Sequence, residues 1–405
     1  MKVLKLKDAG AQKLARGEWE LFERDCVEFS KGLTPGEWII LEDEKSKLKH
    51  LAYVNPVAKN GLVIKLFELN IEKKIRSNLN VQDIWNTIES KLKLACDRRA
   101  VFLSYKSGSR LVYGANDGLV GLIVDQYVQH ILIQINTAGL DAFREQIKNF
   151  FKTRFPEHQV YILDNDVYRA NEGLPNYEDQ LAQFDEIKVE ENGLKYLVNR
   201  KSLQKIGYYY DHRENRLKLS RLITSMDLPY QSGLDLFSYV GSWGMHLLKS
   251  GIKHVTFVDQ GDFEKIITQN LSLNEFELSC GQFVRSDVFK WLNDAIKNNL
   301  EFDVVVSDPP AFAKSDKNVD AALSGYEKLH TLALQLTKNN GLFVAASCTH
   351  YVDVLSLDKT VQRSLRKLSV GGQLLDMGIQ GFDHPVSSLQ DKGLYIKYLV
   401  YKITK

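Results

Sequence analysis

The segment Asp308-Pro309-Pro310-Ala311-Phe312 carries residue types that can act on a flat substrate, and it follows the apolar run Val304–Ser307. Two prolines fix the backbone directly after the acid, so we expect the Asp308 carboxylate to point into a cleft. We expect Phe312 to stack on a planar ring there. An acid, two prolines and an aromatic residue in this order favour a nucleobase acceptor over a hydride acceptor. The alternative is a rigid loop with a solvated acid.

A cysteine follows the next apolar run, residues 341–347, at Cys348. A thiolate at this place is a candidate nucleophile for C6 of cytosine or uracil, which would make C5 able to accept a methyl group from a sulfonium. Asp308 would hydrogen-bond the N3/N4 edge of the base. The thiol needs positive potential to ionise, for which Lys314, His350 and the sulfonium itself are candidates. The alternative is a buried cysteine that acts as a small apolar side chain.

Three places upstream are typical of a nucleotide-like cofactor. The first is the run Leu236–Gly244, where Gly241 and Gly244 allow close backbone approach ahead of a helix N-terminus. It is not a GxGxxG fingerprint. Asp259 ends the next apolar run and is placed to accept hydrogen bonds from ribose hydroxyls, which leaves both NAD and S-adenosylmethionine open. Asp287 is placed for an adenine amine or for capping the helix that follows.

These residues need a sheet whose strands end at one edge. Strands are predicted at 233–239, 254–259, 282–285, 302–307, 341–347, 372–377 and 394–403, with helices at 243–249, 263–273, 288–298, 321–337 and 354–368. Alternation of this kind predicts an α/β fold with a parallel sheet covered on both faces. The short connection between the last two strands, without a helix, predicts an antiparallel C-terminal hairpin.

Two smaller regions precede this one. Residues 1–76 contain four short strand-like runs separated by turn residues, which predicts a small β-barrel-like domain. Residues 2–78 hold fifteen Lys/Arg and twelve Asp/Glu, a net charge of +3, which is compatible with an RNA surface. Residues 79–193 predict a small α+β linking domain, with a helix at 81–98 and strands at 110–113, 118–124 and 130–135. The third domain would span residues 194–405.

The composition excludes several classes of protein. Apolar residues make up 44% and charged residues 26%, which argues against a disordered chain. The net charge of +2 excludes a chain-wide polycation. The four cysteines form no CxxC pair, so neither a disulfide framework nor a metal site is expected. No secretion signal or membrane-spanning run of about 18 apolar residues is present. We expect a soluble cytoplasmic protein with no membrane partner.

Taken together, the motifs resemble those of bacterial large-subunit ribosomal RNA cytosine-5 methyltransferases with an N-terminal PUA domain (RlmI-like). The resemblance covers the whole chain and is strongest in its second half. It rests on Gln204–Arg216, Leu236–Gly241, Phe302–Phe312, Ala345–Thr349, Asp383–Val386 and Gly393–Tyr395.

The resemblance implies a class I methyltransferase with a Rossmann-like, mostly parallel seven-stranded sheet, S-adenosylmethionine as cofactor and ribosomal RNA as partner. It implies Cys348 as nucleophile, with Asp308 at the reacting edge of the base. The implied cofactor-binding residues are Tyr209, Asp211, Arg213, Phe237, Ser238, Gly241, Asp259, Asp287, Asp308 and Pro309. Phe312, Lys314 and His384 are the implied substrate contacts. The first two regions would be the PUA-like RNA-binding domain and the linking domain.

The chain departs from the family pattern at Ser242-Trp243, where the family usually has a second glycine followed by phenylalanine. No second cysteine accompanies the acid-Pro-Pro motif, so the group that removes the C5 proton is not identified. Two other functions stay open: methylation of an exocyclic base amine, with Cys348 incidental, and a non-catalytic RNA-binding assembly factor. The sequence does not decide between a monomer and a homodimer, nor which nucleotide is modified.

Overall fold

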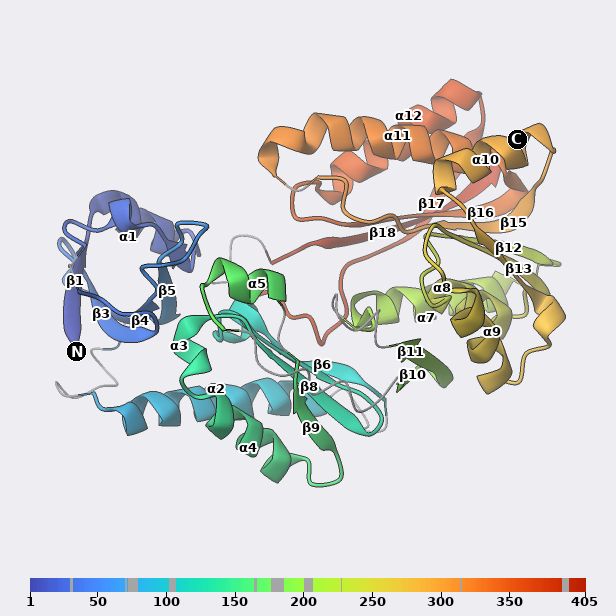
Figure 1. Ribbon diagram of the computed structural model, residues 1–405. Helices are drawn as coiled ribbons and strands as arrows, with labels where there is room; N and C mark the ends of the chain where they lie inside the picture. Colours follow the sequence, from blue (N-terminus) through green and yellow to red (C-terminus); the bar gives the residue numbers. More distant parts are fainter. Residues whose placement is uncertain are drawn as a thin grey trace. The chain divides into compact units, whose positions relative to one another are not determined.

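The computed structural model describes residues 1–29, 32–69, 71, 79–101, 107–163, 166–175, 186–199, 207–226, 228–313, 315–387 and 393–405. The chain divides into two compact units (Figure 1). The first consists of Met1–Ile187, Arg200–Gly207 and Phe382–Gly393, and the second of Lys188–Asn199, Tyr208–Gly381 and Leu394–Lys405. Each unit has its own sheets.

The second unit is built on a seven-stranded sheet in the order β14-β13-β12-β15-β16-β18-β17. The strands are β12 (Ser232–Leu236), β13 (His254–Asp259), β14 (Gly281–Arg285), β15 (Phe302–Ser307), β16 (Thr337–Cys348), β17 (Gly371–Gly378) and β18 (Ile396–Thr404). The first five are parallel, and β18 is antiparallel to both β16 and β17. The predicted strands and antiparallel end of the sheet are confirmed.

One predicted strand ends earlier than expected. β12 stops at Leu236 rather than Tyr239, because Phe237 and Tyr239 have positive φ angles of 62° and 49°. Non-glycine residues rarely adopt this conformation, and it turns the chain out of the sheet. The strand therefore gives way to a strained turn at the edge where a ligand is expected.

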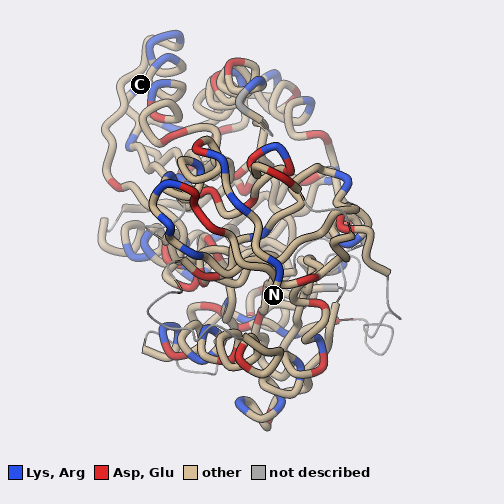
Figure 2. Tube along the Cα trace, turned by 90° about the vertical axis from the view of Figure 1, so that its left-hand side faces the viewer, with Lys and Arg blue, Asp and Glu red and all other residues tan. Residues whose placement is uncertain are grey.

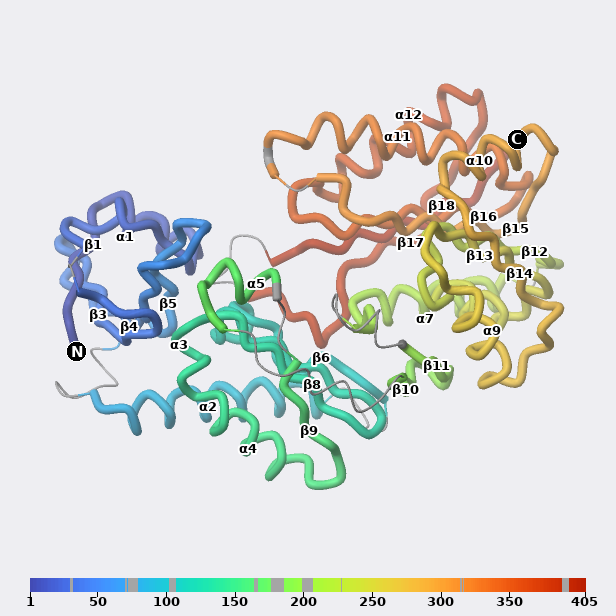
Figure 3. Tube along the Cα trace, viewed as in Figure 1, coloured from blue at the N-terminus to red at the C-terminus, as the bar shows by residue number. Residues whose placement is uncertain are grey.

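Helices cover both faces of this sheet, as the alternating pattern predicts (Figures 1 and 3). α10 (Val288–Lys297), α11 (Val319–Gln335) and α12 (Val354–Leu368) lie on one face, and α7 (Arg213–Met226), α8 (Ser242–Lys249) and α9 (Glu264–Leu273) on the other. β10 (Glu186–Glu191) and β11 (Leu194–Asn199) form a two-stranded sheet, and β11 packs against α9. α7, β10 and β11 were not predicted.

The core of this unit follows from the sequence pattern. Val304, Val305 and Val306 of β15 are fully buried, as expected for a central parallel strand covered on both faces. α12 buries Leu357, Val361 and Leu365, which are spaced four residues apart and share one face of the helix. Asp353 caps this helix, since its carboxylate accepts a hydrogen bond from Ser356 N at 2.7 Å.

Gly244 of α8 is required by helix–sheet packing. A Cβ atom at this position would lie 2.2 Å from Cε1 of Phe257, a buried residue of β13. Gly241, at the N-terminus of α8, has a φ of +84°. The two glycines thus serve different needs: Gly241 permits the turn, whereas Gly244 lets the helix approach the sheet closely.

The first unit contains a five-stranded and a four-stranded sheet. The orders are β1-β3-β4-β5-β2 and β6-β7-β8-β9. The strands of the five-stranded sheet are β1 (Lys2–Leu6), β2 (Glu20–Leu21), β3 (Glu37–Asp43), β4 (Lys49–Val54) and β5 (Ile64–Glu68), and those of the four-stranded sheet are β6 (Ser109–Tyr113), β7 (Leu122–Gln126), β8 (His130–Ile135) and β9 (Gln159–Ile162). The helices are α1 (Asp8–Ala15), α2 (Val81–Ala100), α3 (Ala138–Asp141), α4 (Arg144–Arg154) and α5 (Asp166–Asn171). The two sheets share buried side chains, including Trp38 and Tyr53 from one and Val124 and Ile133 from the other.

A buried charge network ties a late segment of the chain into this first unit. The Asp383 carboxylate accepts a hydrogen bond from Arg110 N at 3.0 Å, and its backbone carbonyl accepts one from Arg99 at 3.0 Å. Arg99 also forms a bidentate pair with Asp117 at 2.7 and 2.8 Å. Since unpaired buried charges are costly, these contacts hold residues 382–387 to α2 and β6. The predicted division into three domains stays a prediction, and its first boundary falls at residues outside the described part.

Lys and Arg residues are interspersed with Asp and Glu residues along the Cα trace (Figure 2). Within the described residues, no helix combines the length and apolar character that crossing a bilayer requires. The same residues contain no cluster of three or more His, Cys, Asp or Glu side chains able to hold a metal ion.

We predict that Gly244→Ala destabilises the protein by up to about 2 kcal/mol. Overpacking of the contact with Phe257 costs about 1–3 kcal/mol, and the gain that alanine brings to a helix interior offsets about 1 kcal/mol of this. Gly371→Ala is a suitable control, since its Cβ would meet Thr404 at an ordinary 3.5 Å. Urea denaturation measures both. Equal midpoints for the two variants would contradict this reading of Gly244.

Candidate active site

The structure brings the predicted acid and nucleophile to one edge of the sheet. β15 and β16 are parallel neighbours, with Ser307 paired to Ala345, so Asp308 follows the end of one strand and Cys348 ends the other. The Cys348 thiol donates a long hydrogen bond to the carbonyl of Pro309, with Sγ and O 3.7 Å apart. Asp308, Pro309 and Cys348 therefore form one wall of the candidate site.

Asp308 is held in place by aromatic residues that the sequence analysis did not connect to it. Trp243 Nε1 donates a hydrogen bond to Asp308 Oδ2 at 2.8 Å, and His212 Nε2 lies 3.6 Å from Oδ1. The Trp243 ring stacks on Tyr398, with centroids 5.9 Å apart and planes 8° from parallel. A hydrogen bond to a charged acceptor stabilises by about 1.5–3 kcal/mol, so the tryptophan that departs from the family pattern fixes the orientation of this carboxylate.

The turn after β12 forms the second part of the site. Asp259 Oδ2 accepts a hydrogen bond from Tyr239 N at 3.0 Å, and Oδ1 accepts one from Gly261 N at 2.8 Å. Each oxygen keeps a lone pair for a ribose hydroxyl. Ser238 is 4% exposed, and its Oγ has no hydrogen-bond partner within the described residues. An unsatisfied buried hydroxyl in a strained turn marks a place where a ligand is expected.

Tyr209, Asp211 and Arg213 lie at the start of α7, around the 3₁₀ turn η5 (Tyr210–His212). The Asp211 carboxylate is buried and accepts a hydrogen bond from the Tyr395 hydroxyl at 2.9 Å. The Arg213 guanidinium lies 4.8 Å from the centroid of the Tyr210 ring. Tyr209 is 41% exposed and packs edge-to-face with Tyr239. The segment thus reaches the turn after β12, as the predicted role in a cofactor pocket requires.

A buried ion pair that the sequence analysis missed supports this segment. Arg216 binds both oxygens of Glu191, at 2.6 and 2.8 Å, and donates to the carbonyl of Tyr209 at 2.6 Å. Burial opposes ionisation of Glu191, but the charge and hydrogen bonds of Arg216 outweigh it and lower the pKa of the glutamate. The pair links β10 to α7, 25 residues apart in sequence, so no local motif could have revealed it.

The site carries a strong negative potential. Burial, followed by the charges of Asp308 and Asp211, raises the pKa of the Cys348 thiol to about 12. Burial and the charges of Asp211, Cys348, Asp308 and Asp259 raise the pKa of Tyr209 to about 12. The charge of Lys397 acts in the opposite direction on the thiol, but burial and the two carboxylates outweigh it. Carboxylates at this density favour a cationic ligand and oppose the diphosphate of NAD.

Three of the other predicted site residues have contacts outside the wall formed by Asp308, Pro309 and Cys348. Asp287 caps α10 through Lys290 N at 2.9 Å and is exposed, so capping does not prevent a second contact. Phe312 is half-buried and packs on Tyr326, with ring centroids 4.7 Å apart. His384 belongs to the first unit, where its Nδ1 lies 2.9 Å from Asp383 Oδ1. Lys314 lies outside the described residues.

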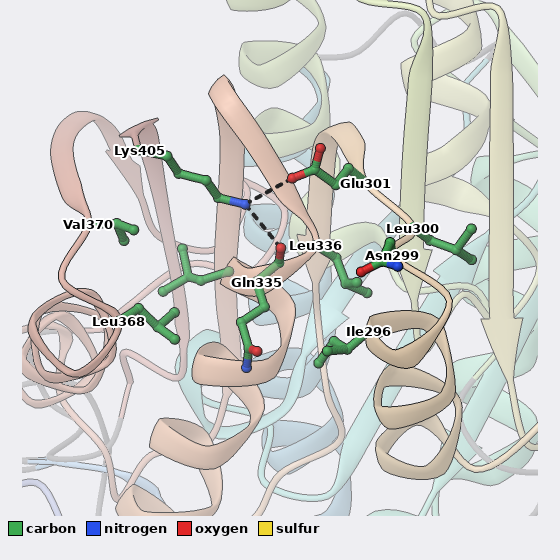
Figure 4. Close-up of a pocket in the computed structure, with 10 residues that line it drawn as sticks. Ile296, Asn299, Leu300, Glu301, Gln335, Leu336, Leu368, Val370 and Lys405 are labelled. Atoms are coloured by element: carbon green, nitrogen blue, oxygen red, sulfur yellow. Dashed lines mark hydrogen bonds and ion pairs between the residues drawn. The ribbon is translucent and has the colours of Figure 1, made fainter.

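A pocket of about 360 Å³ lies at the other end of the strands. Its lining includes Glu301, which precedes β15, whereas Asp308 follows that strand. Lys405 Nζ bonds Glu301 at 3.3 Å and the carbonyl of Gln335 at 3.0 Å (Figure 4). Most other lining residues are aliphatic, and the acid and the amine of this pocket are paired with each other, so it is distinct from the candidate site.

Comparisons with known proteins show which family this chain belongs to. A family model described as conserved hypothetical protein 95 matches residues 219–346. Ribosomal RNA large subunit methyltransferase I of Aeromonas salmonicida is 32% identical over 318 residues, which cover 77% of this chain and 79% of that protein. The protein of the same name from Aeromonas hydrophila is 33% identical over 301 residues, covering 73% and 75%.

This chain belongs to the ribosomal RNA large subunit methyltransferase I family. A putative SAM-dependent methyltransferase from Streptococcus mutans superposes with a TM-score of 0.77 at 21% identity, covering 99% of this chain and 100% of that one. A second structure, a putative methyltransferase complexed with SAH, gives a TM-score of 0.76 at 21% identity over the same shares. The predicted family and its methyltransferase fold are confirmed, and S-adenosylmethionine as the cofactor is confirmed with them.

Asp235, at the end of β12, generates a pH prediction. Burial raises the pKa of Asp235 well above its usual value, and the charges of Asp308 and Asp259 raise it further. The hydrogen bond that Asp235 accepts from Gly244 N at 2.8 Å lowers the pKa but does not outweigh these effects. Between the unfolded pKa of about 4 and the raised folded pKa, the folded state holds the extra proton, so stability falls as pH rises. Asp235→Asn mimics the protonated acid, so its folding stability does not fall with pH for this reason.

We therefore expect the stability of Asp235→Asn relative to wild type to increase from pH 4 upward, by about 1.4 kcal/mol per pH unit until the folded pKa is reached. Urea denaturation across this pH range measures the difference. A difference that does not change with pH would show that Asp235 is ionised in the folded protein.

Proposed function

We propose that this protein transfers a methyl group from S-adenosylmethionine to C5 of a cytosine in large-subunit (23S) ribosomal RNA, through a covalent bond between Cys348 and C6. The observation that carries the proposal is the 3.7 Å contact between Cys348 Sγ and the carbonyl of Pro309, which sets the thiol beside Asp308. A nucleophile and a base-binding acid on one wall are what this chemistry needs.

The residues of the site fit the cofactor. Asp259 would accept the ribose hydroxyls, Asp287 the adenine amine, and the turn with Phe237, Ser238 and Gly241 would lie along the rest of the molecule. Tyr209, Asp211 and Arg213 would close the pocket from α7, and Pro309 would border it. Bound there, the cofactor supplies an electrophilic methyl group on a positively charged sulfur. The carboxylates of the site stabilise that positive charge.

The chain's own residues would act in a fixed order. The thiol loses its proton to solvent, and the Cys348 sulfur forms a bond to C6, which moves the C5–C6 double-bond electrons onto C5. C5 then takes the methyl group. A base removes the C5 proton, the double bond re-forms, and the electrons of the S–C6 bond return to sulfur. Asp308 would accept a hydrogen bond from the N4 amine throughout, held by Trp243.

The RNA would be recognised outside the catalytic wall. The five-stranded sheet of residues 2–68 is proposed as the PUA-like RNA-binding domain, and the relatives' names support ribosomal RNA as the partner. The target base must leave its stack to reach the thiol, with Phe312 stacking on it and Lys314 as a further contact. His384, which belongs to the first unit, is proposed as a contact to the RNA. A ribosomal substrate would place the reaction in the cytoplasm.

A second function is methylation of an exocyclic base amine. The raised pKa of the Cys348 thiol favours it, because a thiol that does not ionise is a poor nucleophile. Asp308, the two prolines and Phe312 would suffice for that reaction, and Cys348 would be incidental. The two reactions differ in whether the enzyme becomes bonded to its RNA.

We predict that RNA containing 5-fluorocytidine forms a stable covalent adduct with the wild-type protein and S-adenosylmethionine. Fluorine at C5 cannot leave as a proton, so the S–C6 bond cannot be released. Cys348→Ala should form no adduct, whereas Cys280→Ala should behave as wild type, since Cys280 lies in the 3₁₀ turn η6 (Leu278–Cys280), before β14. Denaturing electrophoresis of labelled RNA measures the adduct.

Methyl transfer at the wild-type rate by Cys348→Ala would contradict the covalent mechanism and support amine methylation. An adduct that persists in Cys348→Ala would show that another residue is the nucleophile.

A further inference from the structure

More negative than positive side chains act on the Cys348 thiol. Asp308 lies on the loop after β15 and Asp211 on η5, and both carboxylates act on the thiol. The opposing charge is Lys397 of β18, whose neighbour Ile396 pairs with Cys348 across the sheet. Tyr209 and Tyr326 also face the thiol and stay neutral, since burial raises the pKa of both. Two negative charges thus oppose one positive charge.

The thiol also has a partner that favours its protonated form. Its Sγ–H points to the carbonyl of Pro309, an acceptor that a thiolate could not use. Lys397 is 5% exposed and donates to the carbonyls of Thr349 and Tyr395, the latter at 3.2 Å. Its amine is therefore fixed beside the strand end that carries Cys348, and it cannot swing toward the sulfur without losing both bonds.

We propose that Asp211 and Asp308 keep Cys348 protonated until a cationic cofactor enters the site, so that S-adenosylmethionine itself switches on the nucleophile. This inference rests on the proposed function, in which Cys348 is the nucleophile. It assigns Asp211, predicted only to shape the cofactor pocket, a role in controlling the reactivity of the thiol.

The physical reason is the change in net charge. The sulfonium adds a positive charge next to the carboxylates that oppose ionisation, and an opposite charge within about 4–6 Å lowers a thiol's pKa by one or more units. The demethylated product, S-adenosylhomocysteine, has nearly the same shape and lacks this charge. The switch would therefore turn off after each transfer, which would protect the free enzyme from oxidation and from reaction with RNA before a methyl group is available.

The matched pair of cofactors gives a direct test. The rate of alkylation of Cys348 by iodoacetamide is measured by peptide mass mapping, in the full-length protein without RNA. We expect the S-adenosylmethionine complex to react at least about tenfold faster than the S-adenosylhomocysteine complex, because each pKa unit changes the thiolate fraction tenfold. Cys280 in the same protein is the internal reference and should react equally in both complexes.

Variants test the charges without a cofactor. Asp211→Asn and Asp308→Asn should each raise the alkylation rate of Cys348, and Lys397→Gln should lower it while keeping a hydrogen-bond donor. Asp294→Asn, on the exposed side of α10, should leave the rate unchanged. Circular dichroism and thermal unfolding check that each variant folds.

Equal rates with the two cofactors would overturn the proposal. If both cofactors shield the thiol from the reagent, unchanged rates in Asp211→Asn and Asp308→Asn would overturn it instead. Failure of the wild-type protein to bind either cofactor, or a Cys348 that no reagent reaches, would contradict the proposed function itself.

Discussion

The candidate site depends on the parallel pairing of β15 with β16. The two strands are parallel, with Ser307 opposite Ala345, so they run to the same edge of the sheet, where Asp308 follows β15 and Cys348 ends β16. Residue 308 and residue 348 are forty positions apart in the chain, and this pairing alone makes them neighbours. The rest of the second unit supports this edge. β18 and β17 extend the sheet beyond β16, and α11 and α12 cover the strands from one side.

Several carboxyl groups lie close together at this edge of the sheet, although folded proteins usually keep like charges apart. Asp211, Asp235, Asp259 and Asp308 approach one another closely enough to affect each other's ionisation or that of their neighbours. Such an arrangement costs stability unless a cation completes it, so it indicates a site shaped for a positively charged ligand. The same acids make the thiol hard to ionise, which links the affinity for the cofactor to the reactivity of the nucleophile.

Much of the fold was accessible from the sequence, because buried parallel strands and capped amphipathic helices leave local patterns. β8, β13 and α12 have the predicted bounds. β2 has only two residues and carries no pattern. α7 begins with the polar run Arg213–Arg216, which was interpreted as a cofactor motif rather than as a helix start.

The candidate site was predictable only in its strand-end residues. The link between Trp243 and Asp308 joins positions 65 apart, and the pair Arg216–Glu191 joins two elements that were not recognised. The effect of Asp211 on the Cys348 thiol was not predicted, because Asp211 reaches the thiol only through the three-dimensional fold. Contacts of this kind follow from tertiary packing, which no local spacing encodes.

The central claim is that the Cys348 thiol faces the base at the wall formed with Asp308. Its most direct test is the identity of the methylated nucleoside made by the protein on large-subunit ribosomal RNA, determined by chromatography and mass spectrometry. The account predicts 5-methylcytidine. N4-methylcytidine or another amine-methylated nucleoside would contradict it, and so would RNA that carries no new methyl group.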